Sequence, residues 1–540
     1  MEVRRFARAG VVAFLMFTVV NVDGAGVLNT AKLKNYVELF NANDEELYTN
    51  IPNSEAFAFL EANIPLFECP DRNFEQTYYF RWWTYRKHVK KTSDGYVITE
   101  FLPKVSWSGK HNTISCPAGH HYYEGRWLHD PIYLDDYSVF WLRKGGQPRR
   151  YSFWIADAYF ARQMVTPNSE LLVDLLDDLV GNYEAWEKVS LPDKNFLFEQ
   201  IDDRDGMEVS IGGSGYRATI NSYMYGDARA ISKIAAVAGR KVLSAEYSAK
   251  AEKIKQLVQA QLWNEKTQFF SVLGKDTTLA EVRELHGFTP WYVNLPDGDK
   301  GYEKAWAQLM DPRGFYAAYG PTTAEQRSEE FRIAYEGHEC QWNGPSWPMA
   351  TSITLTGLAN LLNNYEQDTI DRKAYFETLT IYTNSHQRKR EDGKLVPWID
   401  ENLNPYTGDW ISRTRLKQWK NNDWDPSKGG KERGKDYNHS TYNDLIITGL
   451  VGLRPRRDDI VEVNPLLPDD TWDYFCLDNV LYHGHIVTII WDQTGEKYNR
   501  GRGLNVFVDG RKVAHSPRLE RITGLLNEPV VRQDVIEIKK

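Results

Sequence analysis

The chain has 540 residues and a formal net charge of −9, with acidic and basic residues interspersed. This length allows at least one large core and predicts more than one domain. The sequence has no basic stripe that would neutralise phosphates, which argues against nucleic acid as a partner. Its 18 Trp and 31 Tyr are an unusual feature. Such rings suit sugar binding but also fill large cores, and composition leaves both interpretations open.

The N-terminus has the pattern of an export signal. Arg4, Arg5 and Arg8 precede an apolar run over residues 9–20, and small residues follow from Gly24. The run is shorter than the ~20 residues that a membrane span needs. We therefore predict a signal peptide over residues 1–24, cleaved near Gly24, and a secreted protein with no integral membrane segment after cleavage. An uncleaved anchor is the minor alternative.

Residues 151–453 show a repeated pattern of helix, aromatic-polar loop and helix. Ser169 is placed to cap a helix over about residues 171–179, and Gly239 to end another over about 217–238. Four more helices are predicted over about 254–262, 347–362, 374–387 and 441–453. Little strand pattern lies between them, so a doubly wound α/β fold is disfavoured and antiparallel helix pairs are the simple interpretation.

After Pro455 the sequence takes on the pattern of short strands. Apolar and β-branched runs cover 460–463, 480–482, 486–491 and 504–508, and Asp509-Gly510 predicts a hairpin turn. We predict a small β-sandwich over residues 456–540, after a helical domain over 25–455. The part before residue 151 is mixed and gives no clear prediction.

Cysteine and histidine patterns give no metal site. Zinc is not indicated, because the sequence has neither a Cys-x-x-Cys nor a His-x-x-x-His pair. Asn438 begins the sequon Asn-His-Ser within an apolar stretch, so we expect it to be buried and unmodified. The cysteines could oxidise in an exported protein, in a pairing that the sequence leaves open: Cys69, Cys116, Cys340 and Cys476.

A first acidic loop lies before the helix predicted over 217–238. Asp202, Asp203, Asp205 and Glu208 fall within seven residues, and three glycines follow by residue 215. Crowded carboxylates raise one another's pKa, which suits a general acid at neutral pH. The alternatives are a calcium loop, although the spacing does not fit an EF-hand, or simple capping of the next helix.

Two further loops have residue types that suit a sugar site. Residues 398–408 form a turn that carries Glu401 between aromatic flanks, although a solvated surface turn would look the same. Residues 339–348 hold Trp342, Asn343 and Trp347 around a Gly-Pro turn. That segment could be a stacking floor with a hydrogen-bonding rim, or a packing corner.

These loops carry a resemblance to a known family. Residues 342–348, Trp-Asn-Gly-Pro-Ser-Trp-Pro, resemble a signature of trehalase-like and family 63-type glycoside hydrolases. Residues 206–210, Gly-Met-Glu-Val-Ser, resemble the loop that bears the general acid in the mannosylglycerate hydrolase branch. Residues 401–408 resemble that clan's general-base loop. The order of the three motifs points to the mannosylglycerate-hydrolase-like group, which includes a β-L-arabinofuranosidase family acting on pectin.

The resemblance implies a mainly α fold, an (α/α)6 barrel with the small C-terminal β-sandwich, and an inverting mechanism. Glu208 would be the acid and Glu401 the base. Position 208 is Glu where the branch has Asp, so Asp205 or Asp203 could hold the acid role instead. Leu403 replaces a common aromatic, which bears on the sugar accepted. The candidates for gripping the sugar are Arg126, Trp127, Arg217, Trp342, Asn343 and Trp347.

The expected activity is hydrolysis of a terminal bond in a plant-type oligo- or polysaccharide, β-L-arabinofuranosidase-like or α-glycosidase-like. No organic cofactor or metal is implied. The alternatives are an inactive carbohydrate-binding protein, which would not need paired acids, and a polysaccharide lyase, which would use Tyr and His near Arg. The sequence leaves the sugar, exo or endo action, and the oligomeric state open.

Overall fold

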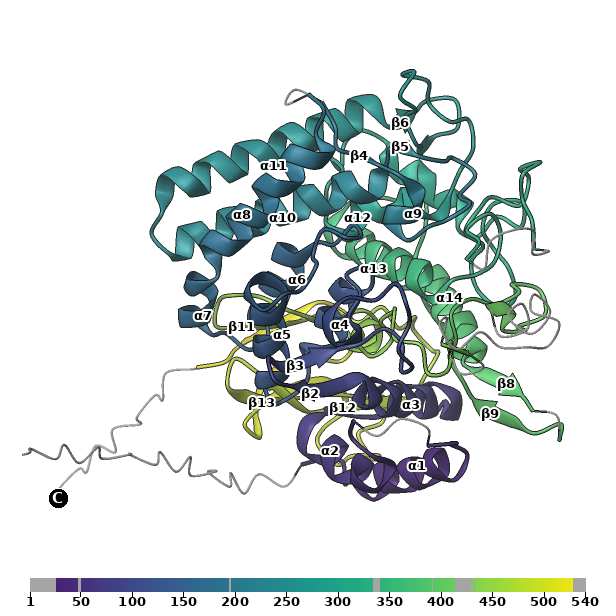
Figure 1. Cartoon of the computed structure of the whole chain (residues 1–540). Helices are drawn as coiled ribbons and strands as arrows, with labels where there is room; N and C mark the ends of the chain where they lie inside the picture. Colours follow the sequence, from purple (N-terminus) through teal and green to yellow (C-terminus); the bar gives the residue numbers. More distant parts are fainter. Residues whose placement is uncertain are drawn as a thin grey trace, which may run out of the picture.

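The computed structural model describes residues 26–46, 50–193, 196–333, 340–390, 392–412, 429–430 and 433–527, so the predicted signal peptide lies outside it. The protein is helix-rich, with small sheets toward its C-terminus (Figure 1). No helix in these ranges is long and apolar enough to cross a membrane. The α-helices are α1 (Ala31–Ala42), α2 (Ala56–Asn63), α3 (Arg72–His88), α4 (Ala118–Gly125), α5 (Ile132–Arg143), α6 (Ile155–Gln163), α7 (Ser169–Asp174), α8 (Leu176–Ser190), α9 (Asp202–Asp205), α10 (Ala218–Val237), α11 (Lys241–Gln261), α12 (Thr289–Tyr292), α13 (Pro348–Asn364), α14 (Arg372–Ser385) and α16 (Asn443–Leu445).

The strands form two larger sheets and four two-stranded ones. The larger sheets have the orders β1-β12-β13-β14-β15 and β10-β11-β16, and each pairing in them is antiparallel. The small sheets pair β2 with β3, β4 with β5, β6 with β7 and β8 with β9. The strands are β1 (Leu66–Glu68), β2 (Val89–Thr92), β3 (Gly95–Ile98), β4 (Glu199–Gln200), β5 (Gly215–Tyr216), β6 (Trp263–Asn264), β7 (Phe269–Phe270), β8 (Gln387–Lys389), β9 (Leu395–Pro397), β10 (Leu453–Arg454), β11 (Ile460–Val463), β12 (Tyr474–Tyr482), β13 (His485–Asp492), β14 (Gly503–Val508), β15 (Arg511–Ser516) and β16 (Ile522–Leu525).

Helices α10 and α11 show how the helical part is layered. Most of α10 is buried, including the polar Asn221 and Ser222, as expected for a helix enclosed on all sides. Helix α11 buries only Tyr247, Ala251, Ile254 and Val258, a single stripe at helical spacing. It covers α10 after a turn at Gly239, whose φ of +71° favours glycine (Figure 1). The helix predicted over 217–238 is confirmed, and α10 and α11 form an inner and outer pair.

Two helix predictions need correction. Asn168, not Ser169, caps α7, because its side chain accepts from the backbone N–H of Leu171. The predicted helix then breaks at Leu175 into α7 and α8. The helix expected over 441–453 is shorter: α16 continues as a π-helical turn over Ile446–Leu450, and β10 begins soon after.

The first 150 residues supply helices α1 to α5, which the sequence left unassigned. Asp71 caps α3 by accepting from the N–H groups of Asn73 and Phe74. The carboxylate of Glu124, at the end of α4, accepts from three successive backbone N–H groups, of Tyr442, Asn443 and Asp444. This side chain therefore ties the start of α16 to α4, and it joins residues more than 300 positions apart.

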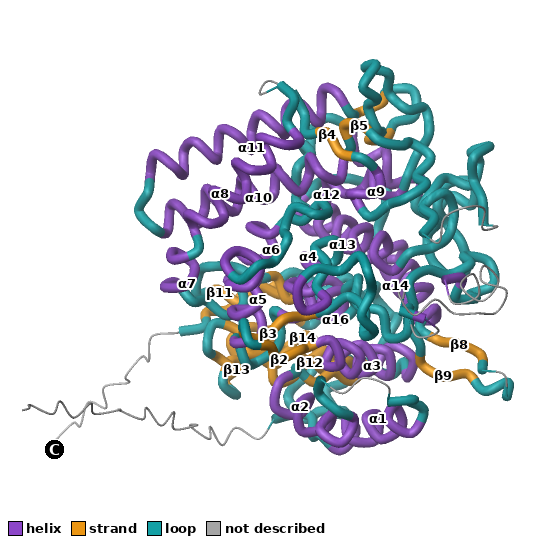
Figure 2. Tube along the Cα trace, in the orientation of Figure 1, coloured by secondary structure: helices purple, strands orange, loops and turns teal. Residues whose placement is uncertain are grey.

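The C-terminal sheets confirm the predicted strands, and they also include β1, a strand from the N-terminal part of the chain. Asp509 and Gly510 both have positive φ, as a two-residue type I′ turn between β14 and β15 requires. Strand β1 pairs with β12 in the register Phe67↔Leu477, so the edge of the five-stranded sheet comes from the N-terminal part. Strands β12, β13 and β14 of this sheet lie together in the lower half of the molecule (Figure 2). This sheet is therefore not built from residues after 456 alone.

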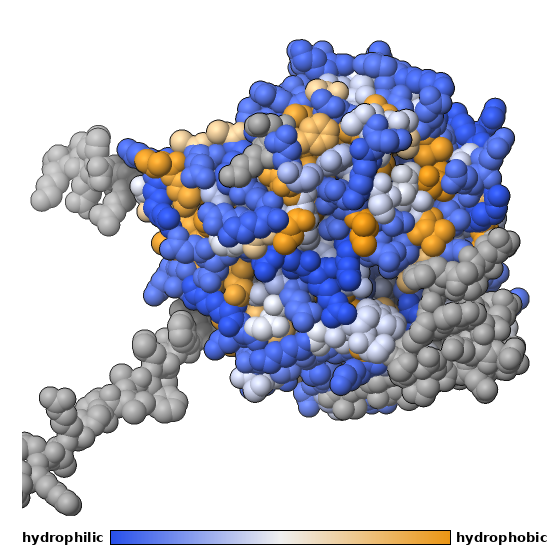
Figure 3. Space-filling view, turned by 45° about the horizontal axis from the view of Figure 1, so that its top comes forward, coloured by the Kyte–Doolittle hydropathy of each residue, from blue (hydrophilic) through white to orange (hydrophobic). Residues whose placement is uncertain are grey.

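The structure also shows the surface, the state of the cysteines and the position of the sequon. The face in Figure 3 is mostly hydrophilic, with apolar residues in small scattered groups. No disulfide joins two of the four cysteines in the described part of the chain. Asn438 of the sequon is 4% exposed and donates to the carbonyl of Thr99, so its predicted burial is confirmed.

Candidate active site

The three motif loops meet through backbone hydrogen bonds. The N–H of Trp342 donates to the carbonyl of Glu208 at 3.0 Å. Ser346 and Leu403 exchange N–H···O bonds in both directions, each at 3.0 Å. These hydrogen bonds hold the three loops next to one another, although the first and last lie about 200 positions apart in the sequence. The fold therefore brings together the three motifs on which the resemblance rests.

These loops border a cavity of about 250 Å³, called here the acidic pocket. Each described residue that lines it lies between positions 100 and 437, so the described strands after residue 456 add no side chain to it. The lining combines three carboxylates and one guanidinium with several aromatic rings. It consists of Glu100, Phe101, Trp107, Ile114, Cys116, Tyr151, Gly206, Glu208, Cys340, Trp347, Glu401, Arg433 and Tyr437.

Glu208 reaches the acidic pocket from a tightly constrained loop. Gly206 has a φ of +71°, and a side chain there would collide with the sulfur of Cys116. Val209 also has a positive φ, +61°, which is strained for a β-branched residue and costs of order 1–3 kcal/mol. Burial above all, together with the charges of Asp203 and Glu401, raises the pKa of Glu208 to about 8. Glu208 is therefore able to hold a proton at neutral pH.

Glu401 is 2% exposed and is fixed at one carboxylate oxygen. Its Oε1 accepts from Nη2 of Arg433 at 3.0 Å and from the thiol of Cys340 at 3.4 Å. Its backbone carbonyl lies 3.0 Å from Nε2 of His439. Oε2 has no hydrogen-bond partner among the described residues. One oxygen thus anchors the group, and the other is available to a water molecule.

Glu100 is a third carboxylate in the acidic pocket, and sequence reasoning missed it. It lies two residues after β3, is 6% exposed and accepts a hydrogen bond from the hydroxyl of Tyr437. Burial above all, together with the charges of Glu401 and Glu208, raises the pKa of Glu100 to about 8. A lone acid after a short strand has no sequence pattern that marks it, and only the fold places it here.

The predicted sugar-binding residues fall into two groups, and the aromatic corner is the first. Trp347 lines the acidic pocket. Trp342 stacks on Trp347, with ring centroids 4.5 Å apart and planes inclined by 17°, and is itself only 3% exposed. Asn343 follows in the same turn, where its backbone carbonyl accepts from the N–H of Arg332. Both rings are buried, but Trp347 is the one that lines the acidic pocket, and Trp342 packs behind it.

The other predicted sugar-binding residues do not line the acidic pocket. Arg217 is fully buried and pairs with Asp205, with 2.6 Å between Nε and Oδ2. Arg126 and Trp127 both donate to Oδ1 of Asp444. Long polar side chains next to loops look alike in sequence whether they bind a ligand or brace a loop. Here all three brace buried carboxylates.

Asp205 and Asp203, the alternative acids, also lie apart from the acidic pocket. Besides Arg217, Asp205 accepts from the hydroxyls of Ser152 and Thr219, so its carboxylate is fully engaged in holding the loop. Asp203 is exposed. Among the described carboxylates of this loop, Glu208 is the one that lines the pocket.

Comparison with known proteins gives two family matches and several similar solved structures. Residues 110–440 match the model of the mannosylglycerate hydrolase MGH1-like glycoside hydrolase domain, and residues 453–515 match the C-terminal domain of glycosyl hydrolase family 65. A solved structure named "Sialidase" is 44% identical over 94% of this chain, with a TM-score of 0.86. This chain spans only 46% of that protein.

A second solved structure shares the fold at low identity. The GH78 family rhamnosidase of Bacillus sp. GL1 is 11% identical over 79% of this chain and 40% of its own length, with a TM-score of 0.52. The match to the MGH1-like domain model, residues 110–440, covers more than half of the chain and includes Glu208, Glu401 and the aromatic corner. The chain therefore belongs to the mannosylglycerate hydrolase MGH1-like glycoside hydrolase family.

Proposed function

We propose that the chain hydrolyses a terminal glycosidic bond with inversion, with Glu208 as general acid and Glu401 as general base. The observation that carries this proposal is that the two glutamates have different surroundings. Burial keeps a proton on Glu208 near pH 7. Glu401 instead forms an ion pair with Arg433. Glu208 would protonate the leaving oxygen. Oε2 of Glu401 would take a proton from the attacking water. Inversion needs the two carboxyl groups roughly 6.5–9.5 Å apart, with the water between them.

We propose a single terminal sugar as the group bound in the acidic pocket. A cavity of about 250 Å³ fits one sugar ring better than a chain. Trp347 offers a stacking face, and the guanidinium of Arg433 lies over the ring of Trp107 at 4.9 Å. Among plant-type substrates, a β-L-arabinofuranoside is the first candidate and an α-glycoside the second.

We propose that the helical part, residues 25–455, is an (α/α)6 barrel, and that residues 456–540 form the β-sandwich module. The support for the barrel is the layering of a mostly buried helix, α10, beneath an amphipathic one, α11. The support for the module is the pair of sheets β12–β15 and β10-β11-β16, although β1 and β10 extend them beyond the proposed boundary. Export through a signal at residues 1–24 is proposed from the charged and apolar pattern of that segment.

Product analysis tests the proposed reaction. The purified chain would be incubated with pectic and α-glucosidic oligosaccharides, and proton NMR would follow the anomeric configuration of the first sugar released. We expect one monosaccharide, released with inverted configuration from the chain end. Release of internal fragments, or retention of configuration, would contradict the proposal. An inactive binding protein would show saturable binding and no product.

A further inference from the structure

A second cavity lies at the far end of the helices that border the acidic pocket. Three residues of the acidic pocket lie just before helices: Trp347 one residue before α13, Cys116 two before α4 and Tyr151 four before α6. Later residues of the same three helices line a cavity of about 210 Å³, called here the rear cavity. In α13, Asn360 lies thirteen positions after Trp347, which is roughly 20 Å of helix at 1.5 Å per residue. The two cavities are therefore separate sites.

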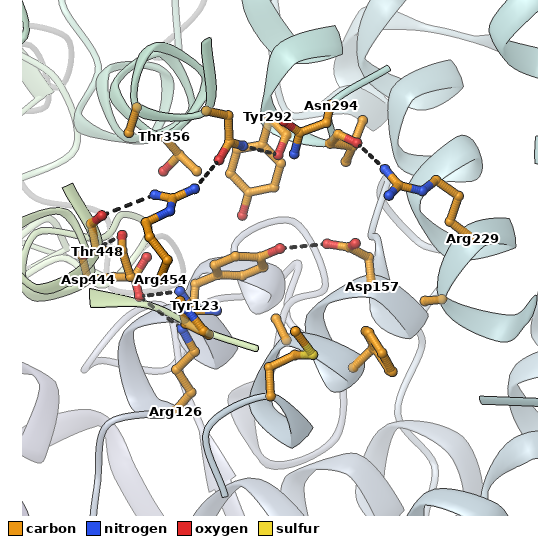
Figure 4. A pocket seen from close by; sticks show the side chains of 18 of the residues that line it. Tyr123, Arg126, Asp157, Arg229, Tyr292, Asn294, Thr356, Asp444, Thr448 and Arg454 are labelled. Carbon is orange, nitrogen blue, oxygen red and sulfur yellow. Dashed lines mark hydrogen bonds and ion pairs between the residues drawn. The ribbon is translucent and has the colours of Figure 1, made fainter. Parts of the chain in front are cut away.

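The rear cavity carries an excess of positive charge. Four cations line it, Arg126, Arg229, Lys233 and Arg454, against the carboxylates of Asp157 and Asp444 (Figure 4). Arg126 pairs with Asp444 at 2.7 Å. Arg454 makes no ion pair with a described residue, and burial lowers the pKa of its guanidinium to about 10. An excess of cations over carboxylates attracts an anion. The acidic pocket has the opposite balance, with three carboxylates and one arginine.

Helix geometry explains part of this charge but not all of it. Arg454 donates to the carbonyl of Thr448 at 3.0 Å, and Arg229 to the carbonyl of Val293 at 2.8 Å. Cations near helix ends commonly satisfy such carbonyls. Lys233, which is exposed at the rim, makes no ion pair or hydrogen bond within the described ranges. Capping therefore leaves at least one cation whose charge is not balanced.

A buried hydroxyl also points into the rear cavity. Tyr292 is 4% exposed, and its hydroxyl has no hydrogen-bond partner in the part of the chain that the structure describes. In Figure 4 it points toward the middle of the cavity, between Arg454 and the ring of Tyr123. A buried hydroxyl without a partner costs free energy unless a ligand or water bonds to it. This hydroxyl is thus the second, independent sign of a polar ligand.

We propose that the rear cavity binds a small hydroxylated carboxylate of monosaccharide size, of which a uronic acid is the type. The carboxylate would lie between Arg454 and Arg126, with Lys233 drawing it in from solvent. The hydroxyls of Tyr292 and Thr356 would bond to ligand hydroxyls. The rings of Tyr123 and Tyr292, 5.3 Å apart, give an apolar surface for the C–H face of a sugar.

Calorimetric titration of the full chain at low salt, with three separate ligands, tests the proposal. D-galacturonate is the probe, D-galactose is the control that lacks the carboxylate, and inorganic phosphate is the control that lacks the sugar. We expect D-galacturonate to bind at least about tenfold more tightly than either control, because a charge-assisted contact and the sugar contacts are both needed. Equal binding of galactose or of phosphate would overturn the proposal, as would no binding of galacturonate.

Two variants place the binding in the rear cavity. Tyr292→Phe removes only the hydroxyl and should weaken galacturonate binding about two- to tenfold. Lys233→Met removes the rim charge and should weaken it about two- to fivefold. Lys34→Met, an exposed lysine on α1, is the matched control and should have no effect. Binding that survives both rear-cavity variants but is lost in Trp347→Ala would place the ligand in the acidic pocket and contradict the proposal.

Discussion

The backbone N–H of Trp342 donates to the backbone carbonyl of Glu208 at 3.0 Å, across 134 residues of sequence. The loop that carries the proposed acid is thus held by its backbone to the aromatic corner that ends in Trp347. The side chain of Glu208 takes no part in this bond. An amide variant at position 208 therefore tests chemistry without removing the contact that positions the loop.

Glu208→Gln and Glu401→Gln should each lose about 10²- to 10⁴-fold in kcat, the usual contribution of a general acid or base. Glu208→Gln should fold normally, whereas Glu401→Gln should also lose stability, because it breaks the buried ion pair with Arg433. Asp203→Asn is the matched control, since it removes an exposed carboxylate from the same loop as Glu208. It should keep its turnover within a fewfold. Steady-state kinetics on a natural oligosaccharide checks all three. Near wild-type turnover of either glutamine variant would exclude that residue from its role.

Asp205→Asn should lower the stability of the protein rather than remove a catalytic group. Arg217 and Asp205 are both fully buried, so the neutral amide leaves the guanidinium without a counter-charge. Breaking one partner of a buried pair costs roughly 3–5 kcal/mol of unfolding free energy. Denaturant unfolding with a circular-dichroism readout measures the loss. A variant as stable as the wild type but inactive on natural substrates would instead make Asp205 the acid.

The sequence identifies the motif loops that border the acidic pocket, but not the other residues that line it. Glu208 and Glu401 lie in short motifs whose glycines and prolines fix the local chain, so local pattern identifies them. Glu100 and Arg433 lie in segments without such a pattern, and only tertiary packing places them in the pocket. Arg126, Trp127 and Arg217 do not line the acidic pocket, and sequence could not show this, because a residue that supports a buried carboxylate and one that contacts a ligand are of the same types. Strand β1 could not be predicted from sequence either, because its three residues, Leu66–Glu68, form a strand by pairing with β12, more than 400 positions away.

The basic limb of the wild-type pH–rate profile should move when the loop loses a charge. The acid must be protonated to act, and the pKa of Glu208 is about 8, so activity should fall as pH rises through about 8. The negative charge of Asp203 helps to raise that pKa. Asp203→Asn should therefore shift the basic limb of kcat to lower pH, while an exposed carboxylate elsewhere, as in Glu38→Gln, should not. A limb that stays in place in Asp203→Asn would mean that another group sets it.

Glu100→Gln should stabilise the protein more at high pH than at low pH. The pKa of Glu100 is about 8 in the folded state against an ordinary 4.5. Between these values the unfolded chain releases the proton and the folded chain keeps it, so the wild type loses stability as pH rises from about 4.5 to about 8. Glutamine removes this loss and keeps a carbonyl for Tyr437. Unfolding free energies at pH 5 and pH 8 should show the variant gaining more than about 1 kcal/mol relative to the wild type. An equal difference at both pH values would contradict the shifted pKa.

The pH dependence of Glu208→Gln on an activated aryl glycoside tests the central assignment most directly. Such a leaving group departs without a proton, so the variant should still turn it over and should be rescued more on it than on natural substrates. With no acid left to ionise at position 208, the basic limb near pH 8 should disappear, while Asp203→Asn should keep a shifted one. A flat profile above pH 7 in Glu208→Gln is the predicted result. A basic limb unchanged from the wild type would contradict the account.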